Sequence, residues 1–214
     1  MQFIPSALIF DLDGLLVDSE PIWFEVEGKF LADLGHVWTR ERADACMGQG
    51  TPNTLGIWKE QFGVNIDVER DTETIIDRML DRAADMALRK GALNLLEKAK
   101  EANCPMAVAS SSPKRLISGV LAAKGIDQYF KVVVSGQEVP RSKPAPDVFL
   151  RAAELLGISV DMCVVLEDTL AGTRAGIAAG ARVLAVPSAD AAAVAAIATW
   201  VVSDLGGAGE VLGF

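Results

Sequence analysis

The chain is poor in histidine, and this shortage limits the chemistry available to it. Among 214 residues there is one histidine, His36, which rules out metal centres built from several imidazoles. His36 is also the only possible partner for a Ser-His-Asp or Cys-His arrangement. It lies in Leu34-Gly35-His36-Val37, after an apolar helical pattern, which is typical of a turn that follows a helix. We therefore expect the chemistry to use carboxylates, lysine, hydroxyls and a metal ion.

Cysteine is scarce as well. Cys46, Cys104 and Cys163 are odd in number, far apart in the sequence and without the spacing of metal ligands. We expect them to be small buried residues of a protein that resides in a reducing compartment.

Long uninterrupted apolar runs are missing. Asp11 and Asp13 interrupt the first run and no basic segment precedes it, so a signal peptide is not expected. Residues 191–202 form the longest late apolar stretch, which is shorter than the roughly 20 residues of a membrane-spanning helix. The sequence predicts a cytoplasmic protein with no membrane partner.

Positive charge is in deficit, with 29 acidic residues against 20 basic ones and a formal net charge of −9. Such a surface repels phosphate backbones, so nucleic acid is not an expected partner. An acidic protein that acts on small phosphate esters needs local help from a metal ion and one or two lysines. Hydrophobic residues make up 50% of the chain, enough for one large domain or a main domain with an insertion. We expect a monomer or a weak dimer.

Two kinds of apolar periodicity divide the chain. Residues 18–88, here called the helical segment, repeat apolar residues at three- and four-residue spacing and predict helices only. Elsewhere strand and helix patterns alternate, which predicts an α/β fold with a doubly wound parallel sheet. The expected strands are 7–10, 106–109, 132–134, 163–166, 183–186 and an edge strand at 200–202. One helix is expected to begin at residue 91, and others are expected at 148–156, 170–179 and 189–198. The alanine-rich last helix is expected to pack on the sheet. The expected domains are a core of residues 1–17 and 89–214 and an all-helical insertion of residues 18–88, with hinges near 15–20 and 86–91.

The first predicted strand ends in two acids and a glycine. Asp11 and Asp13 are two residues apart, so in extended backbone both side chains leave on the same side. Gly14 then lets the chain turn sharply or approach a ligand closely. Two acids in one cleft suggest covalent or acid/base chemistry on a phosphate or a similar group.

Three later strands also lead into polar residues. Ser110-Ser111-Ser112 follows the second core strand, Lys143 comes after the third, and Glu167-Asp168 follows the fourth. Each could be an ordinary cap or loop residue. Together, at the carboxyl ends of parallel strands where ligands bind, they supply a hydroxyl anchor, a cation and metal-binding acids. That set suits phosphoryl transfer.

The pattern Asp11-x-Asp13-Gly14, Ser110, Lys143 and Glu167-Asp168 resembles the four motifs of the haloacid dehalogenase-like phosphohydrolases. The resemblance covers the whole chain, because the helical segment has the position and length of the small cap in one subgroup, which includes the β-phosphoglucomutase-like proteins. It also implies a Rossmann-like core. It implies that Asp11 is the nucleophile and Asp13 the general acid and base. Mg²⁺ would be bound by the Asp11 carboxylate, the Asp13 carbonyl and Asp168, with Glu167 as a further or alternate ligand. Lys143 would stabilise charge, and Ser110 with the Ser111 N–H would hold a phosphate oxygen.

The run from Asp18 to Trp23 resembles the bacterial sugar-phosphate phosphatases of the 2-deoxyglucose-6-phosphatase and hexitol-phosphatase types. The expected activity is therefore hydrolysis of a small phosphorylated metabolite, with Asp18, Glu20, Trp23 and Gln49 contacting the substrate. Related caps often carry an arginine where this chain has Gln49, which argues against a second phosphate on the substrate.

Several alternatives stay open at this point. Mutases that resemble β-phosphoglucomutase have a histidine where Trp23 stands, so hydrolysis is favoured over isomerisation. A dehalogenase would need neither Mg²⁺ nor Asp13. Phosphoglycolate phosphatase is an alternative at the level of substrate, and a binding protein without catalysis is a remote one because no catalytic position is missing.

Overall fold

A computed structural model describes residues 3–40, 46 and 50–214, and six strands form its main sheet. The strand order is β5-β4-β1-β6-β7-β8, and all neighbouring strands are parallel. The strands are β1 (Ala7–Phe10), β4 (Met106–Ser110), β5 (Val132–Ser135), β6 (Cys163–Glu167), β7 (Arg182–Ala185) and β8 (Trp200–Val201). Every predicted strand is present, with ends that differ by a residue or so, and the predicted doubly wound α/β fold is confirmed.

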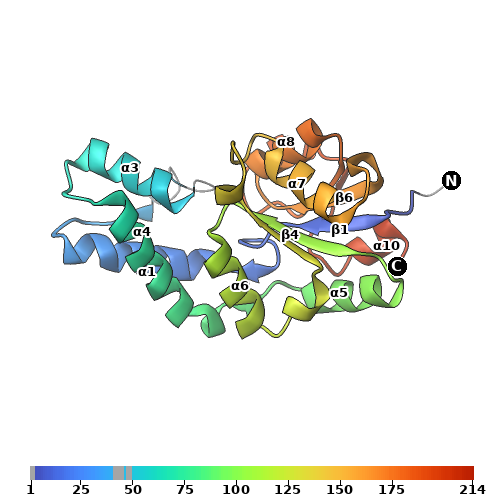
Figure 1. Cartoon of the computed structure of the whole chain (residues 1–214), viewed down its shortest axis with the longest axis horizontal. Coiled ribbons are helices and arrows are strands. Elements are labelled where there is room, and N and C mark those ends of the chain that lie inside the picture. The colour runs from blue at the N-terminus through green and yellow to red at the C-terminus, as the bar shows by residue number, and fades with distance from the viewer. Residues whose placement is uncertain (1–2, 41–45, 47–49) are drawn as a thin grey trace.

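Helices cover both faces of this sheet (Figure 1). Side chains alternate along each strand, so Leu8 and Phe10 face one side while Ala7 and Ile9 face the other. The first side is covered by α5 (Ala92–Glu101), α6 (Lys114–Ala123) and α10 (Ala208–Leu212), and the second by α7 (Asp147–Leu156) and α8 (Leu170–Ala179). Short 3₁₀ turns are η1 (Ala83–Asp85), η2 (Asp127–Tyr129), η3 (Gly136–Glu138) and η4 (Val160–Met162).

The chain after β7 differs from expectation. The helix predicted at 189–198 is the shorter α9 (Ala191–Ala195), and only Val194 of that helix is buried, so its alanines face solvent and do not pack on the sheet. The packing role falls to α10, which the sequence did not predict and whose Ala208 and Leu212 are fully buried. Apolar content alone did not distinguish the packed helix from the exposed one.

The helical segment lies beside the sheet and contains α1 (Glu20–Asp33), α3 (Thr51–Phe62) and α4 (Val68–Asp81), with α4 in contact with both α1 and α3 (Figure 1). Its core includes Trp58, which is buried and stacks with Phe30 at 6.3 Å between ring centroids. Trp38 meets Trp58 edge-on at 4.9 Å. After α1 the chain turns through His36, whose backbone N–H donates to the Leu31 carbonyl, so the expected turn is present.

The two ends of the helical segment are extended, which the prediction of helices alone missed. β2 (Val17–Asp18) pairs antiparallel with β3 (Ala87–Leu88). The chain passes twice between the sheet and the helices at this place, and the pairing satisfies the backbone groups of both passages. The predicted hinge regions are thus tied to each other by backbone hydrogen bonds.

Helix α4 rests on helix α6 of the core. Arg115 of α6 donates to Glu73 at 2.8 Å and also to Asp77 of α4. Lys124 donates to the Ala84 carbonyl at 2.8 Å. These contacts hold the helical segment next to the carboxyl ends of the strands.

Two sequence expectations concern the whole chain. All three cysteines are buried with free thiols, as predicted. Among the described residues, no helix is both long and apolar enough to cross a membrane.

Candidate active site

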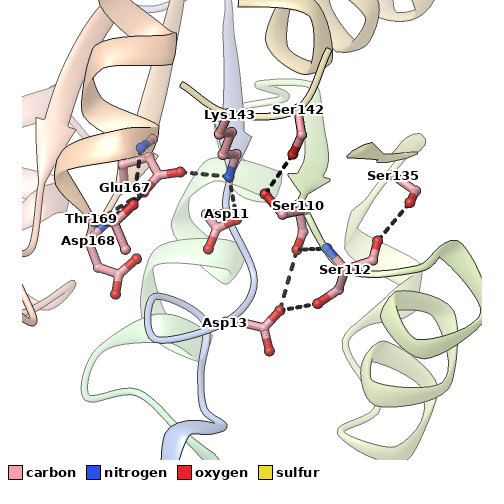
Figure 2. A network of polar contacts seen from close by, with 12 residues as sticks. Asp11, Asp13, Ser110, Ser112, Ser135, Ser142, Lys143, Glu167, Asp168 and Thr169 are labelled. Atoms are coloured by element: carbon pink, nitrogen blue, oxygen red, sulfur yellow. Dashed lines mark hydrogen bonds and ion pairs between the residues drawn. The ribbon is translucent and has the colours of Figure 1, made fainter. Parts of the chain in front are cut away.

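The residues at the ends of four adjacent strands, β5, β4, β1 and β6, converge at one edge of the sheet. β1 lies between β4 and β6 at the place where the strand order reverses, which is where open α/β sheets bind ligands. A cavity of about 150 Å³ opens there, and we call it the strand-end cavity. Its core side is formed by Asp11, Asp13, Ser110, Lys143, Glu167 and Asp168. All the predicted motif residues therefore meet in one place (Figure 2).

Lys143 lies between two carboxylates (Figure 2). Its Nζ is 2.5 Å from Asp11 Oδ1 and 2.6 Å from Glu167 Oε1, and all three side chains are buried. Burial alone would lower the pKa of Lys143, but the charges of Asp11 and Glu167 outweigh it, so the pKa is raised and the ammonium stays charged. Burial raises the pKa of Asp11 to about 7, against the pull of Lys143, and Glu167 and Asp13 add to the increase. One ammonium does not neutralise this acidic group.

Glu167 has protein donors on both of its oxygens. Oε1 accepts from Lys143, while Oε2 accepts from the N–H groups of Asp168 and Thr169 at 3.0 and 3.2 Å and from the Thr169 hydroxyl. Gly172 gives this carboxylate its room, because a Cβ there would lie 1.8 Å from Glu167 Oε1. The side chain is therefore better suited to holding Lys143 and the start of α8 than to binding a metal directly.

Asp168 has the opposite character, because one of its oxygens is unpartnered. Oδ2 accepts from the Ser188 hydroxyl at 2.7 Å, and Oδ1 is buried without a partner among the described residues. Burial, together with the charges of Glu167 and Asp11, raises the pKa of Asp168 well above its usual value. Gly14, at φ +81°, passes so close that a Cβ would lie 2.3 Å from Asp168 Oδ2, so a larger residue would not fit in this turn. Burying a carboxylate oxygen that has no hydrogen-bond partner costs free energy unless a cation binds it.

These residues fit a hard divalent cation. Asp11, Glu167 and Asp168 each offer an oxygen within 4.8 Å of the others, and all three are buried. When all three carboxyl groups are ionised, they exceed the single ammonium of Lys143 by two negative charges, which is the charge that Mg²⁺ would balance. Oxygen-only ligands shared with a substrate phosphate are also typical of Mg²⁺ sites.

Asp13 is held by hydroxyl and indole groups and has no cationic partner in the described part of the chain. Its Oδ1 accepts from Ser19 at 2.7 Å and from Trp23 Nε1 at 3.2 Å. Its Oδ2 accepts from Ser112 at 2.7 Å and from Ser110 at 3.4 Å. Donors from α1 and from the end of β4 thus fix one carboxylate that faces the cavity.

The serines after β4 form a short network (Figure 2). The Ser112 N–H donates to the Ser110 hydroxyl at 3.1 Å, and Ser135 of β5 donates to the Ser112 carbonyl at 2.7 Å. Ser142 donates to the hydroxyl of Ser111, which lines the cavity. The predicted anchor residue Ser110 is therefore beside Asp13, and Ser111 lines the same cavity, where a phosphate oxygen could reach both.

The helical segment supplies the other side of the strand-end cavity. The predicted residues Glu20 and Trp23 line it, together with Phe24, Glu27, Arg40 and Thr54, which were not predicted. Glu20 lies 3.5 Å from Arg40, Oε2 to Nη2. Burial raises the pKa of Glu27 to about 8.

Two of the predicted substrate residues have other outcomes. The structure does not bring Asp18 to the strand-end cavity. Val17 points into the core, so the next side chain of the strand points out, and Asp18 lies 3.7 Å from Arg89 in a second cavity at the hinge. Gln49 falls outside the residues that the structure describes, although its neighbours Gly50 and Thr51 line the strand-end cavity.

Sequence reasoning also missed residues that hold the site together. Ser19 and Ser112 hold Asp13, and Ser188 holds Asp168. Ser19 and Ser112 belong to the two predicted motifs at residues 18–23 and 110–112, so the sequence could have indicated both of them. Ser188 follows β7, the next strand after β6, and the rule that strand ends converge could have identified it.

Comparison with known proteins agrees with this geometry. The family model of haloacid dehalogenase-like hydrolases matches residues 8–186. Hexitol phosphatase B of Escherichia coli (strain K12) is 32% identical over 196 residues, which cover 86% of this chain and 85% of that protein. SUPPRESSOR OF QUENCHING 1, chloroplastic, of Arabidopsis thaliana is 35% identical over 187 residues, which cover 85% of this chain but 18% of that much longer protein.

A solved structure with the same fold is CbbY from Rhodobacter sphaeroides in complex with phosphate. It superposes with a TM-score of 0.87 at 24% identity, over 99% of this chain and 100% of that one. This likeness extends the shared fold to the helical segment as well as to the sheet. The family match and the strand-end residues lead to one conclusion: the chain belongs to the haloacid dehalogenase-like hydrolases, and it is a phosphatase of that family.

Proposed function

We propose that the protein is a Mg²⁺-dependent phosphatase that hydrolyses a small sugar or polyol phosphate through an aspartyl-phosphate intermediate. One observation carries this proposal: Asp11 and Asp13 line the same cavity but are held differently. Asp11 is paired with Lys143 at 2.5 Å, whereas Asp13 accepts hydrogen bonds from hydroxyls and an indole. Two carboxyl groups in such different surroundings are suited to two different roles.

In the first step Asp11 acts as the nucleophile. A carboxylate oxygen of Asp11 forms a bond to phosphorus, and the bond from phosphorus to the leaving oxygen breaks. Asp13 gives its proton to that oxygen, so the product leaves as a neutral alcohol. Lys143 keeps the Asp11 carboxylate oriented and stabilises negative charge on the phosphoryl oxygens.

In the second step Asp13 acts as the base. It takes a proton from a water molecule, whose oxygen forms a bond to phosphorus as the bond to Asp11 breaks. Phosphate and the free Asp11 carboxylate result, and Asp13 is again protonated. The hydroxyl of Ser110 and the Ser111 N–H would hold a phosphate oxygen through both steps.

Asp11 and Asp168 would hold Mg²⁺ with the Asp13 carbonyl, while Glu167 supports the set through Lys143. When bound, Mg²⁺ neutralises charge on the phosphoryl group and keeps it in line for displacement. The unpartnered Asp168 Oδ1 and the excess negative charge support this assignment.

The helical segment is proposed to act as a cap over the strand-end cavity. It contributes Glu20, Trp23 and Glu27 to the cavity wall, opposite the reacting carboxylates. Such a cap excludes water and contacts the leaving group. A sugar or polyol leaving group is suggested by the relative that is named a hexitol phosphatase.

Hydrolysis is favoured over phosphoryl transfer between sugar positions because of Trp23. Its indole N–H donates to Asp13 at 3.2 Å, and an indole neither gives up nor takes up a proton at neutral pH. The residue beside the acid/base group therefore orients it without taking part in proton transfer.

Phosphate release from a panel of sugar, polyol and other small phosphate esters, with Mg²⁺ and with EDTA, tests the proposal. We expect Mg²⁺-dependent release that is fastest for sugar or polyol phosphates. Activity that resists EDTA would contradict the metal assignment. Incubation with β-glucose 1-phosphate and a trace of the bisphosphate gives the second arm: formation of glucose 6-phosphate with little free phosphate would identify a mutase. Absence of turnover on every ester would leave a binding role.

A further inference from the structure

Glu27 is a residue of the strand-end cavity that the mechanism above does not use. It lies on α1, lines the cavity and is half-buried. Among the described residues it has no hydrogen-bond or ion-pair partner, and burial alone accounts for its raised pKa. A carboxyl group withdrawn from water without a partner costs free energy, so its presence in a cavity wall calls for a ligand.

The register of α1 shows which part of a substrate would reach Glu27. Ser19 immediately precedes α1, and Trp23 and Glu27 lie within it. The three residues are spaced by four, so their side chains lie on the same face. Ser19 and Trp23 both donate to Asp13 Oδ1, the carboxylate that meets the leaving oxygen. Glu27 lies one turn further along the helix, about 6 Å from the level of Trp23. A leaving group that begins at Asp13 and extends along the cap by several carbon atoms would end beside Glu27.

Other residues on the cap side of the strand-end cavity offer hydroxyls and aromatic surface. Thr51 and Thr54 come from α3, and Phe24 comes from α1. Arg40 brings a cation to this wall, but its side chain is 57% exposed, faces Glu20 and lies over the ring of Phe24. The cap side of the cavity is therefore suited to a neutral, hydroxyl-rich group that stacks on an aromatic ring.

We propose that Glu27 is a specificity-determining residue that hydrogen-bonds the hydroxyl groups of a polyhydroxylated leaving group and disfavours leaving groups that end in a carboxylate or a second phosphate. The inference deepens the proposed phosphatase function and depends on it. A hydroxyl can donate to a carboxyl oxygen that no described residue satisfies. A carboxylate or phosphate has acceptors and no donor, so it leaves the carbonyl oxygen of a protonated Glu27 without a hydrogen bond and repels Glu27 when that side chain is ionised.

The test compares a polyol phosphate with a hydroxyl-free ester of the same chain length and with two esters that carry a second anionic group. Wild-type protein, Glu27→Gln and Glu27→Leu are assayed with sorbitol 6-phosphate, hexyl phosphate, sorbitol 1,6-bisphosphate and 2-phosphoglycolate, each with Mg²⁺. Glu25→Gln is the matched control, because Glu25 lies on the exposed side of α1 and pairs with Arg82. Wild-type protein should prefer sorbitol 6-phosphate to the other three esters in kcat/KM.

The variants should change this preference through KM. In Glu27→Leu the ratio of kcat/KM for sorbitol 6-phosphate over hexyl phosphate should fall about tenfold or more, because the hydroxyls lose their partner. In Glu27→Gln the same ratio should fall less, because the side chain keeps an acceptor and has the same shape. This variant should also retain the fold if Glu27→Leu does not. Glu25→Gln should leave all four values at the wild-type level.

Other results would overturn the inference. Equal losses on sorbitol 6-phosphate and hexyl phosphate in both variants would mean that Glu27 has only a structural role. A wild-type preference for hexyl phosphate, the bisphosphate or 2-phosphoglycolate would reject the assigned ligand class while the phosphatase function stands. If the wild-type protein hydrolyses no ester, the proposed function fails and this inference fails with it.

Discussion

The two walls of the strand-end cavity are built in different ways. On the core side most polar atoms have fixed protein partners: Lys143 joins two carboxylates, Glu167 is saturated, and four donors hold Asp13. On the cap side Glu27 has none among the described residues. The core wall is therefore ordered by its own hydrogen bonds, whereas the cap wall has hydrogen-bonding capacity to spare.

This contrast indicates which groups of the cavity are expected to bind ligands. A catalytic carboxylate must keep its position before substrate arrives, so its hydrogen bonds are made within the protein. A group that recognises a ligand must keep hydrogen-bonding capacity in reserve. On the core wall Asp168 Oδ1 lacks a partner among the described residues, which indicates a metal site. In the same way, Glu27, also without a partner in the described part of the chain, indicates a site for the leaving group.

The largest effect should come from the core wall. Asp11→Asn keeps the shape of the side chain but removes the nucleophile, so phosphate release should fall on the order of 10⁴-fold or more. The fold should persist, because the amide oxygen of the substituted side chain can still accept from Lys143 and one buried negative charge is gone. Circular dichroism and thermal unfolding provide the control, and an active, folded Asp11→Asn protein would reject the assignment.

Metal removal should act next most strongly. EDTA should abolish activity, and adding back Mg²⁺ should restore it and raise the melting temperature, since a ligand that binds only the folded state stabilises it. The increase should be larger at pH 7.5 than at pH 5, because binding requires deprotonated carboxylates. Thermal unfolding at both pH values measures it. Equal increases, or none, would argue against a metal site at Asp11 and Asp168.

A smaller effect should follow from loosening the core wall. Ser188→Ala removes the hydroxyl that orients Asp168, so half-maximal activation should require about 10 to 100 times more Mg²⁺. Activity at saturating Mg²⁺ should largely recover. Ser203→Ala, at an exposed serine outside the strand-end cavity, is the matched control and should leave the activation curve unchanged. Loss of activity that Mg²⁺ does not rescue would show a different role for Ser188.

The smallest effect concerns the stability of the cap wall. Burial raises the pKa of Glu27 from 4.5 to about 8, so between these values the folded state holds a proton that the unfolded state has lost. Stability therefore decreases as pH rises through this window. Glu27→Gln removes the dependence and should be more stable than the wild type at pH 8, on the order of 1 kcal/mol after allowance for partial exposure.

The difference between Glu27→Gln and wild type should shrink toward zero near pH 4.5. Urea unfolding at several pH values measures it, with Glu25→Gln as the control that should show no such trend. A wild type that is the more stable protein at pH 8 would mean that Glu27 is ionised and paired in the folded state.

The sequence predicted most of the core wall because its signals are local. A buried strand followed by polar residues can be recognised within about ten residues, and parallel strands bring their carboxyl ends together. This was sufficient to group Asp11, Ser110, Lys143 and Glu167. The cap wall offered no such rule, since Asp18 and Glu20 stand two residues apart in one stretch and only Glu20 reaches the cavity.

The α/β fold, the order of its strands along the chain and the set of acids, hydroxyls and lysine at the strand ends follow from short-range periodicity, so they could be read from the sequence. Tertiary structure decided which side chains meet. Lys143 is 132 residues from the carboxylate it contacts, and Ser112 is 99 residues from Asp13. It also decided that Asp168 Oδ1 and Glu27 have no partner among the described residues, since an unfilled place is a property of the whole packed neighbourhood and not of any single stretch of chain.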